Sequence, residues 1–203
     1  MMTCRMGEEL NEQYWTNRYL KKNLGWDIGY VSTPIKEYLD QLKNHEIDIL
    51  IPGAGNAYEA EYLHNNQFRK VQVLDFSKNP LEALKQRVPT FNPDALHQTD
   101  FFSFVGQFDL IIEQTFLSAI SPNRRSEYVH KMHSLLKPKG KLVGVVFGKD
   151  FKTEYPPFGG NILEYKDLFS PFFKIKTMEV AFNSIPERMG SELFINLEKR
   201  FKI

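Results

Sequence analysis

The sequence of 203 residues contains one cysteine, Cys4, which excludes an internal disulfide and a cysteine-ligated metal cluster. It also has no apolar run of about eighteen residues, the length that a membrane-spanning helix requires, and no hydrophobic N-terminal region of a secretion signal. These absences predict a cytoplasmic protein, in a reducing compartment, with no membrane partner.

An excess of charge of either sign is also missing. The net charge is +1 and the basic residues are scattered, so the chain has no basic patch of the kind that binds nucleic acid. With 42% hydrophobic and 25% charged residues, the composition is that of a globular protein. Because we find no repeat, low-complexity tract or linker, we predict a single domain over residues 1–203 and a monomer.

A buried strand, a glycine turn and a helix start follow one another around Ile47–Asn56, which reads IDILIPGAGN. Gly53 and Gly55 form the turn, and the helix begins near Tyr58. This order is typical of the first βα unit of a nucleotide-binding sheet, in which glycines let the backbone approach a ligand closely. The same pattern also occurs in a simple tight turn.

A second short strand, Val71–Asp75, ends in an acid twenty positions after Gly55. A carboxylate at this place can accept hydrogen bonds from both hydroxyls of an adenosine ribose. The alternative is that Asp75 caps the next helix, for which Ser77 is better placed. A nicotinamide site needs a third glycine where this chain has Tyr58, so the pattern favours S-adenosylmethionine over NAD.

Strands and helices alternate along the rest of the chain. We predict further strands at 95–99, 108–112 and 141–147, and capped helices after Ser77 and Ser121. Two alternating apolar runs near the C-terminus, 173–183 and 193–200, predict an antiparallel pair that completes the sheet. The expected fold is therefore α/β, with a doubly wound, mostly parallel sheet.

Ligands of such sheets bind at the carboxyl ends of the parallel strands. After the third predicted strand, residues 95–99, Asp100 is followed by Phe101 and Phe102. An acid next to an aromatic ring can bind an adenine base. An ordinary loop with a buried phenylalanine is the other interpretation. We expect one edge of the sheet to bring together Gly53, Asp75, Asp100, Gln114 and the loop after Phe147.

Aromatic residues are concentrated before the first strand, in residues 8–30. By helical spacing Tyr14, Trp15, Arg18 and Tyr19 share one face. This face either packs on the sheet or belongs to a lid whose rings and Arg18 close over a ligand. We predict that residues 1–30 form such a lid segment.

Together these motifs resemble the thiopurine methyltransferase family, most closely its thiol and halide methyltransferase branch. The matching segments run in order from about Tyr14 to Phe158: YWTNRYL, GWDIG, ILIPGAGNAYEAEYL, VLDFS, DFF, FDLIIEQTFLSAISPNRR, LLKPKGKLV and YPPF. The resemblance implies a Rossmann-like, seven-stranded sheet with an antiparallel last strand. It also implies S-adenosylmethionine as cofactor and in-line methyl transfer to a small soft nucleophile, namely a thiol, hydrosulfide, thiopurine-like or halide acceptor.

The resemblance also implies roles for individual residues. The implied cofactor contacts are Trp15, Tyr19, Trp26, Gly53, Gly55, Asp75, Phe76, Asp100, Phe101, Glu113 and Gln114. No residue is assigned as a catalyst. The candidates for the acceptor pocket are Arg18, Tyr14, Tyr155 and Phe158.

The chain departs from the family pattern at several positions. Tyr19 stands where the thiol and halide branch usually has tryptophan, and Ala54 replaces a cysteine, changes that the cofactor should tolerate. Ser118 stands where many relatives have cysteine, and Gln114 where they have tyrosine or arginine. These last two changes leave the acceptor open. The alternatives are a SAM-binding protein that is non-catalytic or differently specific and, less favoured, a nicotinamide oxidoreductase.

The sequence lacks the motifs of methyltransferases that act on nitrogen or carbon of DNA bases. An amino-directed DNA methyltransferase would carry an NPPY-like motif after the fourth strand, where this chain has EQTF, and Cys4 is badly placed for cytosine-carbon chemistry. His130 and His133 lack a third ligand, so we expect no metal. The sequence has no obvious histidine or lysine base at the strand ends. This fits a thiol acceptor, because a thiol with a pKa near 8.5 supplies some thiolate at neutral pH without a protein base.

Overall fold

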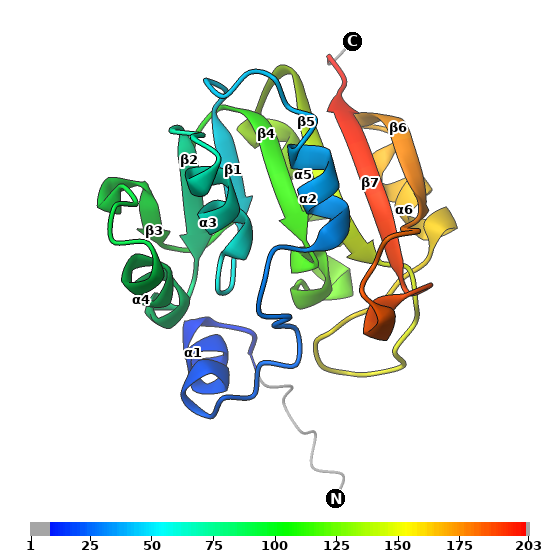
Figure 1. Cartoon of the computed structure of the whole chain (residues 1–203). Helices are drawn as coiled ribbons and strands as arrows, with labels where there is room; N and C mark the ends of the chain where they lie inside the picture. The colour runs from blue at the N-terminus through cyan, green and yellow to red at the C-terminus, as the bar shows by residue number, and fades with distance from the viewer. Residues whose placement is uncertain (1–8, 202–203) are drawn as a thin grey trace, which may run out of the picture.

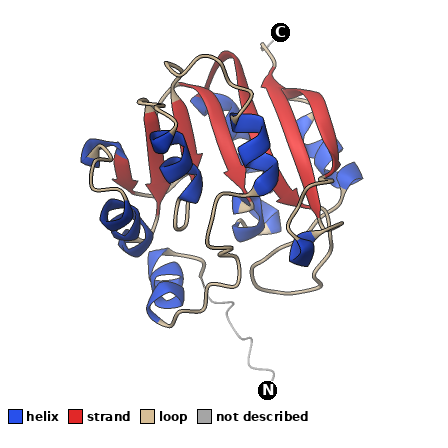
Figure 2. Ribbon diagram, in the orientation of Figure 1, coloured by secondary structure: helices blue, strands red, loops and turns tan. Residues whose placement is uncertain are grey.

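The computed structural model describes residues 9–201, whose seven strands form one sheet (Figures 1 and 2). The strand order is β3-β2-β1-β4-β5-β7-β6, with β1 to β5 parallel and β7 antiparallel to both of its neighbours. The strands are β1 (Ile49–Pro52), β2 (Val71–Asp75), β3 (Leu96–Gln98), β4 (Phe108–Gln114), β5 (Leu136–Phe147), β6 (Phe173–Val180) and β7 (Glu192–Lys199). The predicted α/β fold is confirmed. Cys4 lies outside the described residues.

Helices cover both faces of this sheet (Figure 2). They are α1 (Glu12–Leu20), α2 (Thr33–Leu39), α3 (Tyr58–Asn65), α4 (Lys78–Arg87), α5 (Arg125–Leu135) and α6 (Ile162–Phe169). Side chains of α2, α3 and α4 pack into one hydrophobic cluster, and those of α5 and α6 into another. None of the helices within residues 9–201 is long and apolar enough to cross a membrane.

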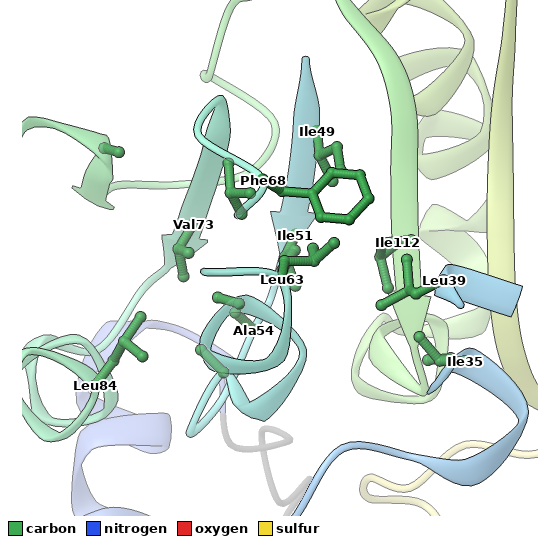
Figure 3. Close-up of a cluster of buried hydrophobic side chains, with 14 of the residues drawn as sticks. Ile35, Leu39, Ile49, Ile51, Ala54, Leu63, Phe68, Val73, Leu84 and Ile112 are labelled. Atoms are coloured by element: carbon green, nitrogen blue, oxygen red, sulfur yellow. The ribbon is translucent and has the colours of Figure 1, made fainter. Parts of the chain in front are cut away.

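The alternation of strand side chains supplies both clusters. Ile49 and Ile51 point into the first cluster, beside Phe68 and Leu63, as Figure 3 shows. Leu50, between them in the strand, belongs to the second cluster. A strand buried on both faces reads as a continuous apolar run, which is why the sequence around β1 predicted this strand correctly.

The strand boundaries differ from the prediction by up to five residues, and two of the differences have a clear local cause. β5 begins at Leu136 rather than at residue 141, because Leu136 already pairs with β4 before the register shifts. The shift includes Lys139, whose φ of 63° is left-handed. Ser121 does not cap a helix with its side chain. A 3-10 turn, Pro122–Arg124, intervenes before α5.

The carboxyl ends of β1 to β5 lie at one edge of the sheet, where α1 and the loop after β5 also lie (Figure 1). We call residues 148–161 of that loop the acceptor loop, because it contains Tyr155 and Phe158, two of the predicted candidates for the acceptor pocket. The predicted ligand-binding edge is therefore enclosed by two segments that are far apart in the sequence.

Candidate active site

A cavity of about 1240 Å³ opens at the carboxyl edge of the sheet. Ligand pockets typically have roughly 300–1,000 Å³, so this cavity has room for two ligands. It brings together most of the predicted site residues: Trp15, Arg18, Tyr19, Trp26, Gly53, Gly55, Asp75, Phe76, Asp100, Phe101, Gln114, Tyr155 and Phe158.

The glycine turn after β1 forms the floor of the cavity. Gly53 and Gly55 have φ values of 56° and 53°, in the left-handed region that side chains disfavour. A Cβ atom on Gly53 would lie 2.0 Å from Cδ2 of Phe116. Glycine is therefore required at position 53 by backbone conformation and by space.

Asp75 closes this turn from the end of β2. Its Oδ2 accepts the Gly55 N–H at 3.0 Å, and its Oδ1 accepts the Ser77 N–H at 2.9 Å. Burial raises the pKa of Asp75 to about 6, and these backbone hydrogen bonds oppose the rise. The side chain is thus ionised at neutral pH and lines the cavity as a hydrogen-bond acceptor. Ser77 makes the side-chain cap of α4, through the Asn79 N–H.

Aromatic side chains of the N-terminal segment form the opposite wall. The rings of Trp15 and Tyr19 meet the ring of Trp26 edge-on, with centroids 5.6 Å and 5.9 Å apart. The guanidinium of Arg18 lies 5.1 Å from the Trp26 ring centroid. Burial raises the pKa of the Tyr19 hydroxyl, so this group keeps its proton and can donate.

Gln114, at the end of β4, carries an unpaired buried oxygen. Its Oε1 has no hydrogen-bond partner. The residue lines the large cavity and also a small one of about 40 Å³ behind the glycine turn, where Asp27 and Glu59 lie. Leaving a buried acceptor unpaired costs about 1–3 kcal/mol, so a ligand that donates a hydrogen bond here removes a penalty.

The acceptor loop supplies a largely apolar wall of the cavity, to which its Lys149 and Glu154 also contribute. Phe151, Tyr155, Pro156, Pro157 and Phe158 all line it. Phe151 also packs edge-on against Phe147 at the end of β5, with ring centroids 5.0 Å apart.

Two predicted site residues do not line the cavity. Tyr14 is only 8% exposed and packs edge-on against Trp15, because the face of α1 toward the cavity carries positions 15, 18 and 19. Glu113 is fully buried, because the alternation of β4 turns its side chain toward α5. The expectation that both side chains face the ligands is therefore wrong.

Glu113 has a different function in the fold. Its carboxylate accepts the Tyr128 hydroxyl and, at 3.0 Å, the Leu117 N–H. Burial raises the pKa of Glu113 to about 7. These contacts fix the 3-10 turn Phe116–Ala119, and Phe116 of that turn lies against Gly53.

Several cavity residues were not predicted. Phe116, Arg124, Arg188 and Met189 line it. Arg188 is 8% exposed, donates to the Trp26 carbonyl at 2.5 Å and pairs with Glu192 at 3.1 Å. The residues between β6 and β7 carry no local motif, and only the insertion of β7 beside β5 brings them to the site.

Histidines and metal clusters do not contribute to this cavity. None of the described residues that line it is a histidine. Within residues 9–201, no group of three or more histidine, cysteine, aspartate or glutamate side chains could hold a metal ion. His130 and His133 both lie beside Phe172 on the surface.

The seven-stranded sheet with this strand order has the fold of the class I S-adenosylmethionine-dependent methyltransferases. A solved member with a similar fold is the Burkholderia thailandensis 1,6-didemethyltoxoflavin-N1-methyltransferase, determined with S-adenosylhomocysteine, with a TM-score of 0.74 and 17% identity over 94% of this chain and 87% of that one. Within this class, the chain belongs to the thiopurine S-methyltransferase family, whose model matches residues 10–193. It is a methyltransferase that uses S-adenosylmethionine.

Two plant proteins are among the similar sequences. A probable thiol methyltransferase 2 from Arabidopsis thaliana is 28% identical over 82% of this chain and 76% of its own length. Thiocyanate methyltransferase 1 from the same plant is 26% identical over 90% of this chain and 83% of its own length. The predicted resemblance to the family is therefore confirmed.

Proposed function

We propose that this enzyme methylates a small soft nucleophile, namely a thiol, hydrosulfide, thiopurine-like or halide acceptor, by in-line displacement. The observation that carries the proposal is the composition of the cavity wall. The acceptor loop lines the cavity mostly with aromatic and proline side chains, and none of the described lining residues is a histidine. The named activities of the plant relatives support it and add thiocyanate to the acceptors worth testing. We further propose that the protein acts as a monomer in the cytoplasm.

The residues of the cavity fit S-adenosylmethionine, which supplies a methyl group activated by a positively charged sulfur. Asp75 would accept hydrogen bonds from the ribose hydroxyls, and Asp100 with Phe101 would contact the adenine. The open backbone of Gly53 and the unpaired Oε1 of Gln114 suit the methionine end, whose ammonium group is a donor. This set of contacts leaves the acceptor loop for the second substrate.

For a soft nucleophile the chain must supply alignment and a dry site rather than a base. Holding two reactants in line is worth roughly 7–11 kcal/mol. The apolar wall of the acceptor loop lowers the local dielectric, which strengthens the attraction between an anion and a sulfonium. Within residues 9–201, Arg18 hydrogen bonds to the Asn23 carbonyl and the Tyr14 hydroxyl, lies over the Trp26 ring and has no carboxylate partner, so its charge is available to an anionic acceptor.

Methyl transfer from labelled S-adenosylmethionine to a panel of acceptors tests the proposal. The panel contains hydrosulfide, an aliphatic thiol, thiophenol, thiocyanate and iodide. We expect turnover of at least one of them. Calorimetry should show binding of S-adenosylhomocysteine and none of NADH. Cofactor binding without transfer to any member of the panel would favour the non-catalytic or differently specific alternative.

The N-terminal segment yields a separate prediction. Its helix α1 docks on the start of α4 through a hydrogen bond of 3.0 Å from the Thr16 hydroxyl to that of Ser77. If Trp15 and Tyr19 cover a bound ligand, S-adenosylhomocysteine should slow protease cleavage between residues 9 and 25. Equal cleavage with and without ligand would show that these rings only pack on the protein.

A further inference from the structure

The acceptor loop is held by a residue that does not line the cavity. Arg125, the first residue of α5, is 4% exposed, and its Nη2 donates to the Gly159 carbonyl at 2.6 Å. Its Nη1 forms an ion pair with Glu164 of α6, and the guanidinium lies 5.6 Å from the Tyr165 ring centroid. One buried cation thus joins two helices and the end of the acceptor loop.

The other contacts of the loop are of a different kind. The Phe158 N–H donates to the Ser118 carbonyl at 2.7 Å, which is a backbone pair. Thr153 donates to the Tyr155 carbonyl at 2.7 Å, which is a contact within the loop. Among residues 9–201, Arg125 is the only side chain from outside the loop that hydrogen bonds to its backbone.

The loop has little room to move independently at this point. A Cβ on Gly159 would lie 1.7 Å from the carbonyl oxygen of Lys149, so the two ends of the loop are in close contact. A displaced Gly159 therefore shifts both ends, and with them the wall formed by Tyr155 and Phe158. The predicted cofactor contacts Gly53 and Asp75 belong to other elements, since Gly53 follows β1 and Asp75 ends β2.

We propose that Arg125 is a positioning residue for the methyl acceptor and acts through the Gly159 carbonyl on the wall of the acceptor loop. The inference rests on the proposed function, since it assigns this wall to the acceptor. The planar guanidinium reaches Glu164 and Gly159 from two different nitrogens of one rigid fork, whereas a lysine ammonium is a single point donor on a flexible stem and does not reproduce this geometry. The acceptor site should therefore depend on arginine rather than on positive charge alone.

The kinetic test compares Arg125→Lys and Arg125→Met with Val129→Ala, a change at a fully buried position one turn further along α5. The probe acceptor is thiophenol or thiocyanate, whichever the wild type turns over faster. Both Arg125 variants should raise KM for the acceptor about tenfold, the loss typical of one charged hydrogen bond. The kcat and the Kd for S-adenosylhomocysteine should stay near the wild-type values, and Val129→Ala should change none of the three.

A second measurement does not depend on turnover. Trypsin can cut the acceptor loop after Lys149 or Lys152, and cleavage there should be faster in both Arg125 variants than in the wild type or Val129→Ala. If no acceptor of the panel is methylated, the proposed function fails while this readout still decides the anchoring. An unchanged KM and cleavage rate in the folded Arg125→Lys variant would overturn the proposal. So would a parallel loss of cofactor affinity, since that indicates general damage to the fold.

Discussion

Replacing Asp75 with alanine should weaken S-adenosylhomocysteine binding about a hundredfold or more. In the proposed function the carboxylate accepts two ribose hydroxyls, and each hydrogen bond to a charged group is worth about 1.5–3 kcal/mol. The same side chain also holds the Gly55 N–H at 3.0 Å, so its loss loosens the glycine turn as well. Calorimetry with wild type and variant measures the ratio, and an affinity within a factor of three of the wild type would remove Asp75 from the site.

The pH dependence of binding separates the charge of Asp75 from its shape. Because its pKa is raised to about 6, the affinity of the wild type should fall as the pH drops below 6, by up to tenfold per unit. The Asp75→Asn variant should bind weakly at every pH and show no such fall.

Stability provides the control for this variant. Folding raises the pKa of Asp75 from 3.8, so the native state binds more protons than the unfolded state between about pH 4 and 6. The stability contributed by this group is therefore full below pH 4 and lost as the pH rises through 6. The asparagine side chain has one oxygen for the two N–H groups of Gly55 and Ser77, so a small drop in the melting temperature is expected at pH 7. A variant that is unfolded at the temperature of the binding measurement would mean that the binding loss comes from unfolding.

Local patterns in the sequence predicted the parts of the site that depend on one strand and the turn after it. Gly53 and Asp75 follow buried strands, and the apolar runs before them are visible without any tertiary information. Parallel strands end at the same edge, which placed Asp100 and Gln114 beside them. These expectations hold because backbone geometry alone brings the strand ends together.

Side-chain direction and distant contacts could not be predicted in this way. Glu113 was expected at the ligand from the family resemblance, but the alternation of β4 decides which neighbour faces the cavity, and that is Gln114. The prediction that Tyr14 lines the acceptor pocket was wrong because helical spacing places it near Trp15 but does not determine which side of α1 is buried. Arg188 reaches the site only through the order of β5, β7 and β6, which no local pattern contains.

The rate of thiol methylation should follow the ionisation of the thiol and of no protein group. At saturating cofactor, kcat/KM for a thiol should rise about tenfold per pH unit and level off near that thiol's own pKa. For an aliphatic thiol with a pKa near 8.5, the rate at pH 6.5 should then be about a hundredfold below the plateau. An aromatic thiol, which is more acidic, should reach its plateau at a lower pH by the difference between the two pKa values.

A halide or thiocyanate acceptor has no proton to lose at these pH values and provides the control. Its profile should be flat where the thiol profile is steep, and any inflection that both share belongs to the protein. The carboxyl groups of Asp75 and Glu113, with pKa values of about 6 and 7, are the groups near the site that could produce such a shared inflection. An inflection fixed near pH 6–7 for every thiol and absent for the halide would instead mean that a protein base takes the thiol proton. Since no histidine is among the described residues that line the cavity, we expect the inflection to move with the acceptor.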